Sequence, residues 1–440
     1  MMAADAADWV DIPPVTAPIA AGVILPGSKS ITNRALALAS VAEGKSILTG
    51  VLFADDTLRM IEALQSLDIP ISVDEAARTI TIMGTGGPFA ERSVDLFCQN
   101  AGTAIRFLTA LCAASPGRYR LDGNARMRER PIGELAGAIR SLGGRVEFEL
   151  NDGYPPLVTG GGLGGGRCRF EQTKSSQYIS AVLIAAPLSR TAVEVELCGP
   201  VTSEPYLRMT IEMMKRFGNR PQHIPGAGDG MKRIRVAAPS GYHGCAFGIE
   251  PDASNASYFL AAAAVIPGSR IEIPGLGRDS LQGDVLFADV LRQMGADVFM
   301  DRLSMQLTGP KHLTGLTIDM NSIPDMVQTL AVTALFADCP TRIVNVPNLR
   351  LKETDRLAAL ETELRKLGAG VRTTEDSIEI HPAQSYHPAS IDTYDDHRMA
   401  MAFAVAALRI KGVRINNPGC TAKTYPGFFT DFTRFISSRS

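Results

Sequence analysis

A segment of similar pattern occurs six times along the chain. Each copy opens with a short polar cluster and continues as a helix rich in Ala and Leu, at residues 28–42, 100–114, 175–188, 252–266, 325–337 and 395–408. The copies follow one another at intervals of about 71 to 76 residues, a near-regular period that indicates structural repeats. Because each repeat is one supersecondary unit, this period limits the possible folds more strongly than any single motif.

The residues after each helix predict the rest of the unit. A Gly, Pro or charged turn is followed by a short β-branched run, for example at 46–52, 191–197, 269–276 and 341–349. Five units continue with a second, amphipathic helix, expected at 57–67, 132–142, 205–217, 288–294 and 354–367. A further pair of strands follows most of these helices. Each unit is therefore predicted to be βαβαββ.

The six Ala-rich helices are apolar on nearly all sides, which is typical of buried helices. The pattern predicts an α/β protein with helices inside and sheets outside, three units to a domain. An ordinary α/β protein with unrelated Ala-rich helices is the alternative, and the shared period and polar clusters favour repeats. A domain boundary is expected between the third and fourth units, where residues 226–248 suit a crossover.

Bulk composition excludes several classes of protein. A length of 440 residues indicates two or three domains, and a net charge of −2 indicates no nucleic-acid or anionic-membrane partner. The seven cysteines are scattered without a C-x-x-C pair, so reduced thiols are expected and a zinc site is not. The longest apolar runs are roughly 10 residues, half of a membrane span. The acidic N-terminus is no signal peptide, so a cytoplasmic protein is predicted.

Two glycine-containing motifs resemble nucleotide loops without matching them. The tract GGGLGGG at 160–166 lacks the strand and helix that such a loop needs, so a turn is predicted. LPGSKS has the glycine spacing of a P-loop with Gly22 and Gly27, but Ser28 stands where that motif requires Lys, and Pro26 occupies the loop. The sequence does not favour a nucleotide hydrolase.

The polar clusters place cations and hydroxyl groups at helix N-termini, where free N–H groups favour anions. The cluster residues are Lys29, Ser30, Arg34, Asn100, Thr103, Arg106, Ser175, Ser176, Gln177, Asp325, His397 and Arg398. The segments between them add Arg126, Arg128, Arg130, Lys174, Lys352, Arg356 and Lys423. Any one of these cations is more often a solvated surface charge, but together they indicate a site for several phosphates and carboxylates.

Two carboxylates stand among these cations and are candidates for acid–base chemistry. Asp325 begins a buried helix, and Glu353 lies between Lys352 and Arg356. Asp325 as a helix N-cap and Glu353 as a helix-start ion pair are the structural alternatives. The residue pattern alone leaves both interpretations open.

Ten motifs in the same order resemble the EPSP synthase (3-phosphoshikimate 1-carboxyvinyltransferase) branch of the enolpyruvyl transferase family. The resemblance covers residues 19–432. Each motif is weak by itself, and their order makes the match specific. They are LPGSKS-x-x-NRAL, NAGTAIR, RMRERPI, SSQY, SEPY, DASNASYFLAAA, IPD, N-x-R-x-KETDRL, DDHRMAMA and CTAKTYP.

The resemblance implies a two-lobed, inside-out α/β barrel with three βαβαββ units in each lobe. The first lobe would span 22–247 and the second 1–21 plus 248–440, with the active site in the cleft between them and closure on substrate. It implies transfer of the enolpyruvyl group of phosphoenolpyruvate to the 5-hydroxyl of shikimate 3-phosphate, releasing phosphate and forming 5-enolpyruvylshikimate 3-phosphate. This is a step of aromatic amino acid biosynthesis that needs no metal or cofactor, and a monomer is expected.

The resemblance also assigns residues. Shikimate 3-phosphate would be held by Lys29, Ser30, Arg34, Ser175, Ser176, Gln177, Ser203, Tyr206, Asp325, Asn348 and Lys352. Phosphoenolpyruvate would contact Lys29, Asn100, Gly102, Arg130, Gln177, Arg356, Arg398 and Lys423. Asp325 would take the proton from the 5-hydroxyl, and Glu353 with Lys29 would handle the proton on the methylene carbon. His397 is interpreted as an orienting residue.

One departure and two alternatives accompany the resemblance. The family often has proline after the arginine of NAGTA-x-R, whereas Phe107 follows Arg106 here, beside the place where the inhibitor glyphosate would bind. The sister family that uses UDP-N-acetylglucosamine typically has a reactive Cys on the loop matching 124–130, and this chain reads NARMRER. A non-catalytic relative of the fold would be expected to lack Asp325, Glu353 or Lys29, and all three are present.

Overall fold

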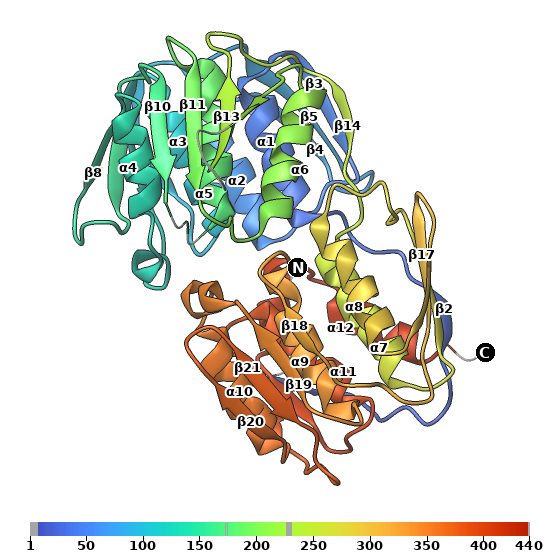
Figure 1. The fold of residues 1–440 in the computed structure, drawn as a ribbon. Helices are drawn as coiled ribbons and strands as arrows, with labels where there is room; N and C mark the ends of the chain where they lie inside the picture. Colours follow the sequence, from blue (N-terminus) through green and yellow to red (C-terminus); the bar gives the residue numbers. More distant parts are fainter. Residues whose placement is uncertain (1–7, 172, 174, 226–230, 439–440) are drawn as a thin grey trace. The chain divides into compact units, whose positions relative to one another are not determined.

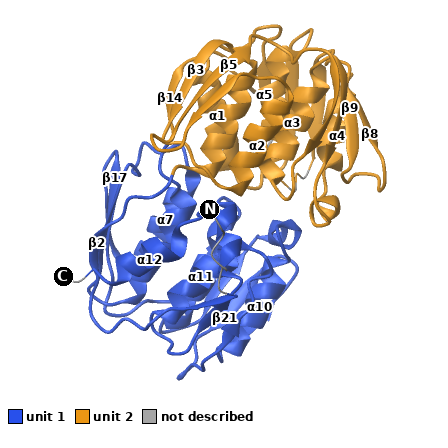
Figure 2. Ribbon diagram, turned by 180° about the vertical axis from the view of Figure 1, so that it is seen from behind, with its two compact units in different colours: residues 1–26, 250–440 blue, residues 27–249 orange. Residues whose placement is uncertain are grey.

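A computed structural model describes residues 8–171, 173, 175–225 and 231–438. Contacts divide the chain into two compact units: unit 1 is Met1–Pro26 with Glu250–Ser440, and unit 2 is Gly27–Ile249 (Figure 2). The chain thus passes between the units at 26/27 and at 249/250. Part of the expected crossover, residues 226–230, lies outside the described residues. In the part of the chain that is described, no helix is long and apolar enough to span a membrane.

Six helices of the described chain are buried on nearly every side, at the positions of the predicted Ala-rich segments (Figure 1). They are α1 (Lys29–Val41), α3 (Gly102–Ala113), α5 (Ser176–Ala185), α7 (Ala253–Val265), α9 (Val327–Thr333) and α11 (His397–Ala407). Polar residues start them because side-chain oxygens cap free backbone N–H groups. Ser28, Ser175, Asp252 and Asp396 each accept such a hydrogen bond.

The second, amphipathic helices also form within a few residues of their predicted ranges. They are α2 (Asp55–Ser66), α4 (Gly133–Ser141), α6 (Glu204–Arg216), α8 (Phe287–Gln293) and α10 (Arg356–Lys366). A C-terminal helix, α12 (Phe428–Ile436), was not predicted from the sequence. Its Phe432 and Phe435 pack on Phe259 of α7, with ring centroids 5.7 and 5.3 Å apart, so this helix completes the apolar core of unit 1.

Three four-stranded sheets are described in unit 2. Their orders are β14 (Ala246–Gly248), β3 (Glu43–Thr49), β5 (Thr79–Thr85), β4 (Ile71–Asp74); then β6 (Arg92–Phe97), β7 (Gly117–Asp122), β9 (Leu157–Gly160), β8 (Arg145–Phe148); and β10 (Gly166–Phe170), β11 (Val193–Cys198), β13 (Met231–Val236), β12 (Gln222–Pro225). In each sheet the first pair of strands is parallel and the other two pairs are antiparallel.

Unit 1 contains two four-stranded sheets of the same pattern and one of three strands, within the described residues. Their orders are β2 (Ala20–Gly22), β15 (Arg270–Pro274), β17 (Ser304–Thr308), β16 (Asp297–Met300); then β18 (Thr317–Asp319), β19 (Thr341–Val344), β21 (Ile378–His381), β20 (Gly370–Thr373); and β22 (Ser390–Ile391), β23 (Arg414–Asn416), β1 (Trp9–Asp11). The fold is mixed α/β. Every described strand belongs to an open sheet with edge strands, so the closed barrel expected from the resemblance is not found there.

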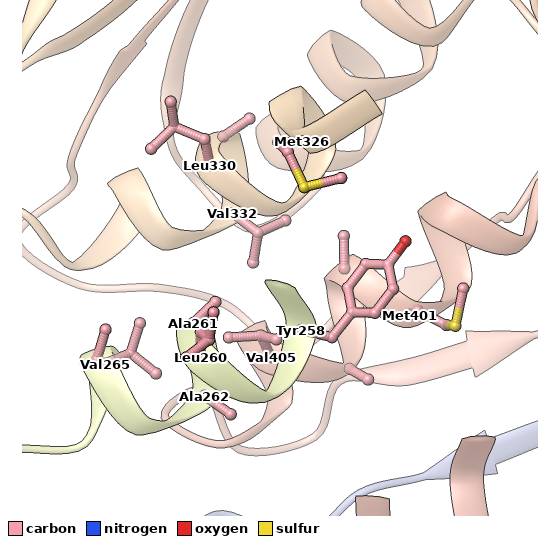
Figure 3. Packing of buried hydrophobic residues seen from close by; sticks show 14 of the residues in the cluster. Tyr258, Leu260, Ala261, Ala262, Val265, Met326, Leu330, Val332, Met401 and Val405 are labelled. Atoms are coloured by element: carbon pink, nitrogen blue, oxygen red, sulfur yellow. The ribbon is translucent and has the colours of Figure 1, made fainter. Parts of the chain in front are cut away.

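The core of unit 1 lies where its buried helices meet. Figure 3 shows Tyr258 and Leu260 of α7, Leu330 of α9 and Val405 of α11 gathered in one apolar cluster. Small Ala side chains at 261–264 let the helices approach closely. Close packing of the apolar parts of these helices fixes their polar first turns, and these turns position the candidate site residues.

Candidate active site

In unit 1, the carboxylate of Asp325 lies among three cations. Asp325 is on the 3₁₀ turn Pro324–Met326 that leads into α9. Its Oδ1 accepts a hydrogen bond from Nη1 of Arg356 at 3.0 Å and lies 3.3 Å from Nζ of Lys352. Its Oδ2 accepts from Nη2 of Arg398 at 3.0 Å. Nearby positive charges favour the ionised carboxylate and hold its orientation. The structure thus supports more than a helix-capping role for Asp325.

The guanidinium of Arg356 is surrounded by three carboxylates and is 1% exposed. Besides Asp325, it donates to Glu353 Oε2 at 2.9 Å and to Asp396 Oδ2 at 2.7 Å. Desolvation alone would lower the pKa of Arg356, but the three carboxylates outweigh it and raise the pKa above its usual value. Arg356, the first residue of α10, therefore stays charged and links the starts of α9, α10 and α11.

Arg398 is supported from behind by α7. Its Nη2 donates to the Ser254 hydroxyl oxygen at 3.4 Å, and its Nη1 lies 3.5 Å from the Tyr258 hydroxyl. The Ser254 hydroxyl in turn donates to Asp284 on the turn Gly283–Leu286. Because Ser254 and Asp284 are both buried, this chain of contacts orients Arg398 toward Asp325.

The other unit 1 candidates lie around this group. The Lys352 side chain is 24% exposed, and desolvation lowers its pKa although Asp325 and Glu353 act in the opposite direction. Asn348 is buried on the turn Pro347–Leu351, and its side-chain oxygen is buried without a hydrogen-bond partner. His397 is buried next to Asp396, and Lys423 is buried at the end of the turn Pro418–Lys423.

In unit 2, the first candidate cation is Lys29, the first residue of α1. Its Nζ lies 3.4 Å from Oδ2 of Asp56, which is buried in the first turn of α2. The Lys29 side chain is 14% exposed. A buried ion pair of this kind fixes the ammonium at the start of the helix.

At the start of α3, the Arg130 guanidinium rests directly on Gly102. Arg130 Nη1 donates to the backbone oxygen and to Oδ1 of Asn100, at 3.1 and 2.9 Å. A Cβ atom added at Gly102 would lie only 2.6 Å from Nη2 of Arg130. The absence of a side chain at this position therefore lets a cation lie against the N-terminus of α3.

Gln177 joins the starts of α3 and α5. Its side-chain oxygen accepts from Nη1 of Arg106 at 2.5 Å, and its side-chain nitrogen donates to the Thr103 hydroxyl at 3.3 Å. Ser175 caps α5 by accepting from the Gln177 backbone N–H, and Ser176 is buried beside it. The residues at two helix starts thus form one hydrogen-bonded group.

Arg34 is positioned as a structural bridge between helices. It is 1% exposed; Nε donates to the Thr210 hydroxyl at 2.8 Å, Nη1 to the Ser30 backbone oxygen at 3.0 Å, and Nη2 to the Tyr206 backbone oxygen at 3.4 Å. Burial lowers its pKa to about 10. These contacts join α1 to α6, where Ser203 begins the helix in the left-handed region with φ 58°. All three nitrogens of Arg34 thus donate to protein groups.

Two arginines of RMRERP form ion pairs with nearby carboxylates of unit 2. Arg126 pairs with Glu129 at 2.7 Å, and Arg128 pairs with Asp122 at 2.7 Å. Both are partly exposed, as expected for solvated surface charges. Lys174, also among the candidate cations, lies outside the described residues.

Several residues that complete both groups were not predicted from the sequence. In unit 1 they are Asp396, Ser254, Tyr258 and Asp284, and in unit 2 Asp56. The signal that was present is an acidic or hydroxyl residue in the polar start of a buried helix, as in DASNASY and DDHR. Which of these residues face a cation depends on how the helices pack, so spacing alone did not identify them.

Each group by itself can bind small anions, and the group in unit 1 can also move protons. Helix starts and paired cations stabilise phosphate and carboxylate groups. Asp325 and Glu353 are held within reach of those cations and can accept or donate a proton. Among the described residues, no cluster of three or more His, Cys, Asp or Glu side chains could hold a metal ion.

Comparison with known proteins gives one consistent result. The family model "EPSP synthase (3-phosphoshikimate 1-carboxyvinyltransferase)" matches residues 15–432. A 3-phosphoshikimate 1-carboxyvinyltransferase from Nostoc punctiforme is 43% identical over 98% of this chain and 99% of that protein. The enzyme of that name from Laribacter hongkongensis is 47% identical over 97% of this chain and 99% of its own.

A plant relative and a solved structure agree. The chloroplastic enzyme of Solanum lycopersicum is 45% identical over 93% of this chain and 81% of its own length. A solved structure of EPSP synthase from Acinetobacter baumannii superposes with a TM-score of 0.79 at 24% identity, covering 96% of this chain and 97% of that one. At that identity the structural match establishes the shared fold.

Proposed function

Because this chain belongs to the EPSP synthase family, we propose that its two groups of residues carry out the enolpyruvyl transfer of that family. The chain is an enolpyruvyl transferase. In the proposed reaction the 5-hydroxyl oxygen of shikimate 3-phosphate bonds to C2 of phosphoenolpyruvate. Phosphate then leaves, and 5-enolpyruvylshikimate 3-phosphate remains.

The observation that carries the mechanism is the carboxylate of Asp325 held by three cations in unit 1. Asp325 takes the proton from the 5-hydroxyl as the C–O bond forms, and a proton is added to the methylene carbon, giving a tetrahedral intermediate. Glu353, with Lys29, supplies that proton and removes one from the resulting methyl group when the bond to phosphate breaks. Arg356, Arg398 and Lys423 neutralise the charge that develops on the leaving phosphate.

A phosphate-release assay tests this function. With phosphoenolpyruvate and shikimate 3-phosphate together we expect stoichiometric phosphate and a product heavier than shikimate 3-phosphate by one enolpyruvyl group, detected by mass spectrometry. UDP-N-acetylglucosamine in place of shikimate 3-phosphate should release none. Activity with the sugar nucleotide would favour the sister reaction, and inactivity with both acceptors would favour a non-catalytic relative.

We propose that cations of both units contribute to binding of shikimate 3-phosphate. Lys29→Met in unit 2 and Lys352→Met in unit 1 should each weaken that binding, because each removes a charged partner worth about 1.5 kcal/mol, or roughly tenfold in affinity. Isothermal titration calorimetry with each variant measures the change. Arg126→Met, which removes a cation already paired with Glu129, is the control. Loss of affinity in only one of the two lysine variants would contradict a shared site.

Ser254 is expected to act as a positioning residue through Arg398. Ser254→Ala removes the hydrogen bond accepted from Arg398 and the one donated to Asp284. Loss of the Arg398 contact, worth about 0.5–1.5 kcal/mol, should raise the KM for phosphoenolpyruvate roughly two- to tenfold. Ser254→Thr, which keeps the hydroxyl, should restore the KM. Ser257→Ala is the matched control, because Ser257 is also buried on α7 but contacts Thr329 and the Ser254 backbone. An equal rise in both Ala variants would refute the positioning role.

We also propose that each unit is built from repeated βαβαββ segments, and the strand order of the sheets supports this. Five four-stranded sheets have one parallel and two antiparallel pairs in the same order, and the shorter sheet β22-β23-β1 matches their first three strands. Each sheet with its two helices would be one βαβαββ unit, three to a lobe, with lobes at 22–247 and at 1–21 plus 248–440. We further propose that the protein is cytoplasmic and monomeric. Size-exclusion chromatography with light scattering would test the monomeric state.

A further inference from the structure

A cavity of about 720 Å³ lies in unit 2 between helix α6 and the sheet β10-β11-β13-β12, apart from the residues described above. Six aliphatic side chains form its wall: Leu197, Val201, Leu207, Ile211, Ile224 and Ile234. The size is within the range of roughly 300–1,000 Å³ that is usual for small-molecule sites. An aliphatic wall offers water few hydrogen bonds, so an apolar group is the favoured occupant.

The mouth of the cavity is charged. Arg208, Lys232 and Arg233 line the cavity together with Glu204, Glu212 and His223. The side chains of Arg208 and Lys232 are 75% and 53% exposed, whereas the aliphatic wall is mostly buried. An apolar interior with a charged, solvent-facing mouth is the pattern expected for an amphipathic ligand.

The balance of charge at this mouth favours an anion. Glu204 accepts hydrogen bonds from both Lys232 and Arg208 at 3.0 Å. Desolvation would raise the pKa of Glu204, but these hydrogen bonds lower it, so its carboxylate is ionised and already shared by two cations. Glu212 pairs with Lys215, which does not line the cavity. Positive charge is therefore in excess among the lining residues.

Helix α6 separates this cavity from the proposed substrate residues. One face of α6 lines the cavity through Leu207, Arg208 and Ile211. The backbone oxygen of Tyr206 and the hydroxyl of Thr210, on the same turns of α6, accept hydrogen bonds from Arg34. Residues three or four apart are neighbours on a helix, so Thr210 lies next to Leu207, and a ligand against Leu207 and Ile211 presses on the turns that hold Arg34.

We propose that this cavity binds a small amphipathic monoanion, its apolar body against the aliphatic wall and its anionic group at Lys232 and Arg233, and that this binding is coupled through α6 to binding of shikimate 3-phosphate. The coupling rests on the proposed function, whereas the binding site does not. Coupling of two sites is reciprocal, so each ligand must change the affinity of the other by the same factor.

The binding test uses 8-anilinonaphthalene-1-sulfonate, an aromatic monoanion whose fluorescence rises in apolar surroundings. Titration of the full chain should show a saturable rise. Val201→Phe and Ile211→Phe fill the cavity from two sides and should each weaken binding at least tenfold. Lys232→Met should weaken it about fivefold, corresponding to ~1 kcal/mol for an exposed charge. N-phenyl-1-naphthylamine, which has the same rings without the sulfonate, should not respond to Lys232→Met.

Two controls locate the dye. Lys352→Met removes a cation of unit 1 and should leave the dye affinity unchanged. Thermal melts establish that the two cavity-filling variants, Val201→Phe and Ile211→Phe, are folded. Wild-type dye affinity in both filled variants, or weakening in Lys352→Met instead of Lys232→Met, would overturn the site.

The coupling is measured by titrating shikimate 3-phosphate with and without saturating dye. We expect the dissociation constant to change more than twofold in the wild type and to be unaffected by dye in Ile211→Phe. An unchanged constant in the wild type would overturn the coupling. Absence of any shikimate 3-phosphate binding would instead contradict the proposed function, and the dye titrations would be unaffected.

Discussion

Replacing Asp325 by Ala is expected to lower turnover by about 10²–10⁴-fold, the usual contribution of a positioned general acid or base. Both oxygens of this carboxylate face cations, so the ionised form is held in one orientation and is available to accept the 5-hydroxyl proton. The measurement is the rate of phosphate release at saturating concentrations of both substrates. Binding of shikimate 3-phosphate should persist in Asp325→Ala, because the residues proposed to hold its phosphate are others.

A matched carboxylate distinguishes catalysis from general disturbance of the unit. Asp319 precedes Asp325 on the same segment but is exposed and bonds only to Asn321 and Asn345 in the contacts described. Asp319→Ala should change turnover by no more than about twofold, as for other surface positions. Asp325→Asn keeps the shape without the charge and should be as slow as Asp325→Ala. Near-normal turnover in either Asp325 variant would remove the residue from the mechanism.

Adding a methyl group at Gly102 is expected to weaken the binding of glyphosate by roughly ten- to a hundredfold and the binding of phosphoenolpyruvate by less. Such overpacking costs about 1–3 kcal/mol. The structure indicates how the methyl group would act: the new Cβ would lie 2.6 Å from Arg130 Nη2 and must displace that guanidinium. Glyphosate is the longer of the two molecules and should lose more. The inhibition constant and the KM for phosphoenolpyruvate in Gly102→Ala give the comparison.

A double-mutant cycle tests whether the methyl group acts through Arg130. If it does, Gly102→Ala should add little in a chain that already carries Arg130→Met, and the two effects will not sum. Gly137→Ala is the control, because a Cβ at Gly137 of α4 meets no atom within 4 Å. Equal fold changes for the two ligands in Gly102→Ala would show that Gly102 serves only helix packing. Phe107, buried on α3 and 5.2 Å from the Arg34 guanidinium, fills the place where the family often has proline.

The positions of the helices were predicted more closely than their first and last residues or the residues that they contact. Alanine-rich segments with polar starts are recognisable because local propensity and capping act within a few residues. The helix α12 was missed because its apolar residues, Phe428 and Phe432 among them, lie in a short C-terminal segment outside the repeated pattern. The contacts of the predicted site residues are not uniform. Arg34 is a buried bridge to α6, and Arg128 is a surface ion pair.

The sequence by itself determined the mixed α/β class, the buried helices and the concentration of cations at their starts, since all of these depend on residues close together in the chain. Only the tertiary structure decided which charges meet. Asp325, Arg356 and Asp396 are far apart in sequence, and packing of α9, α10 and α11 brings them together. Electrostatic contacts depend on distances of a few ångströms, which chain spacing does not specify. For the same reason, the cavity behind α6 could be found only in the folded protein.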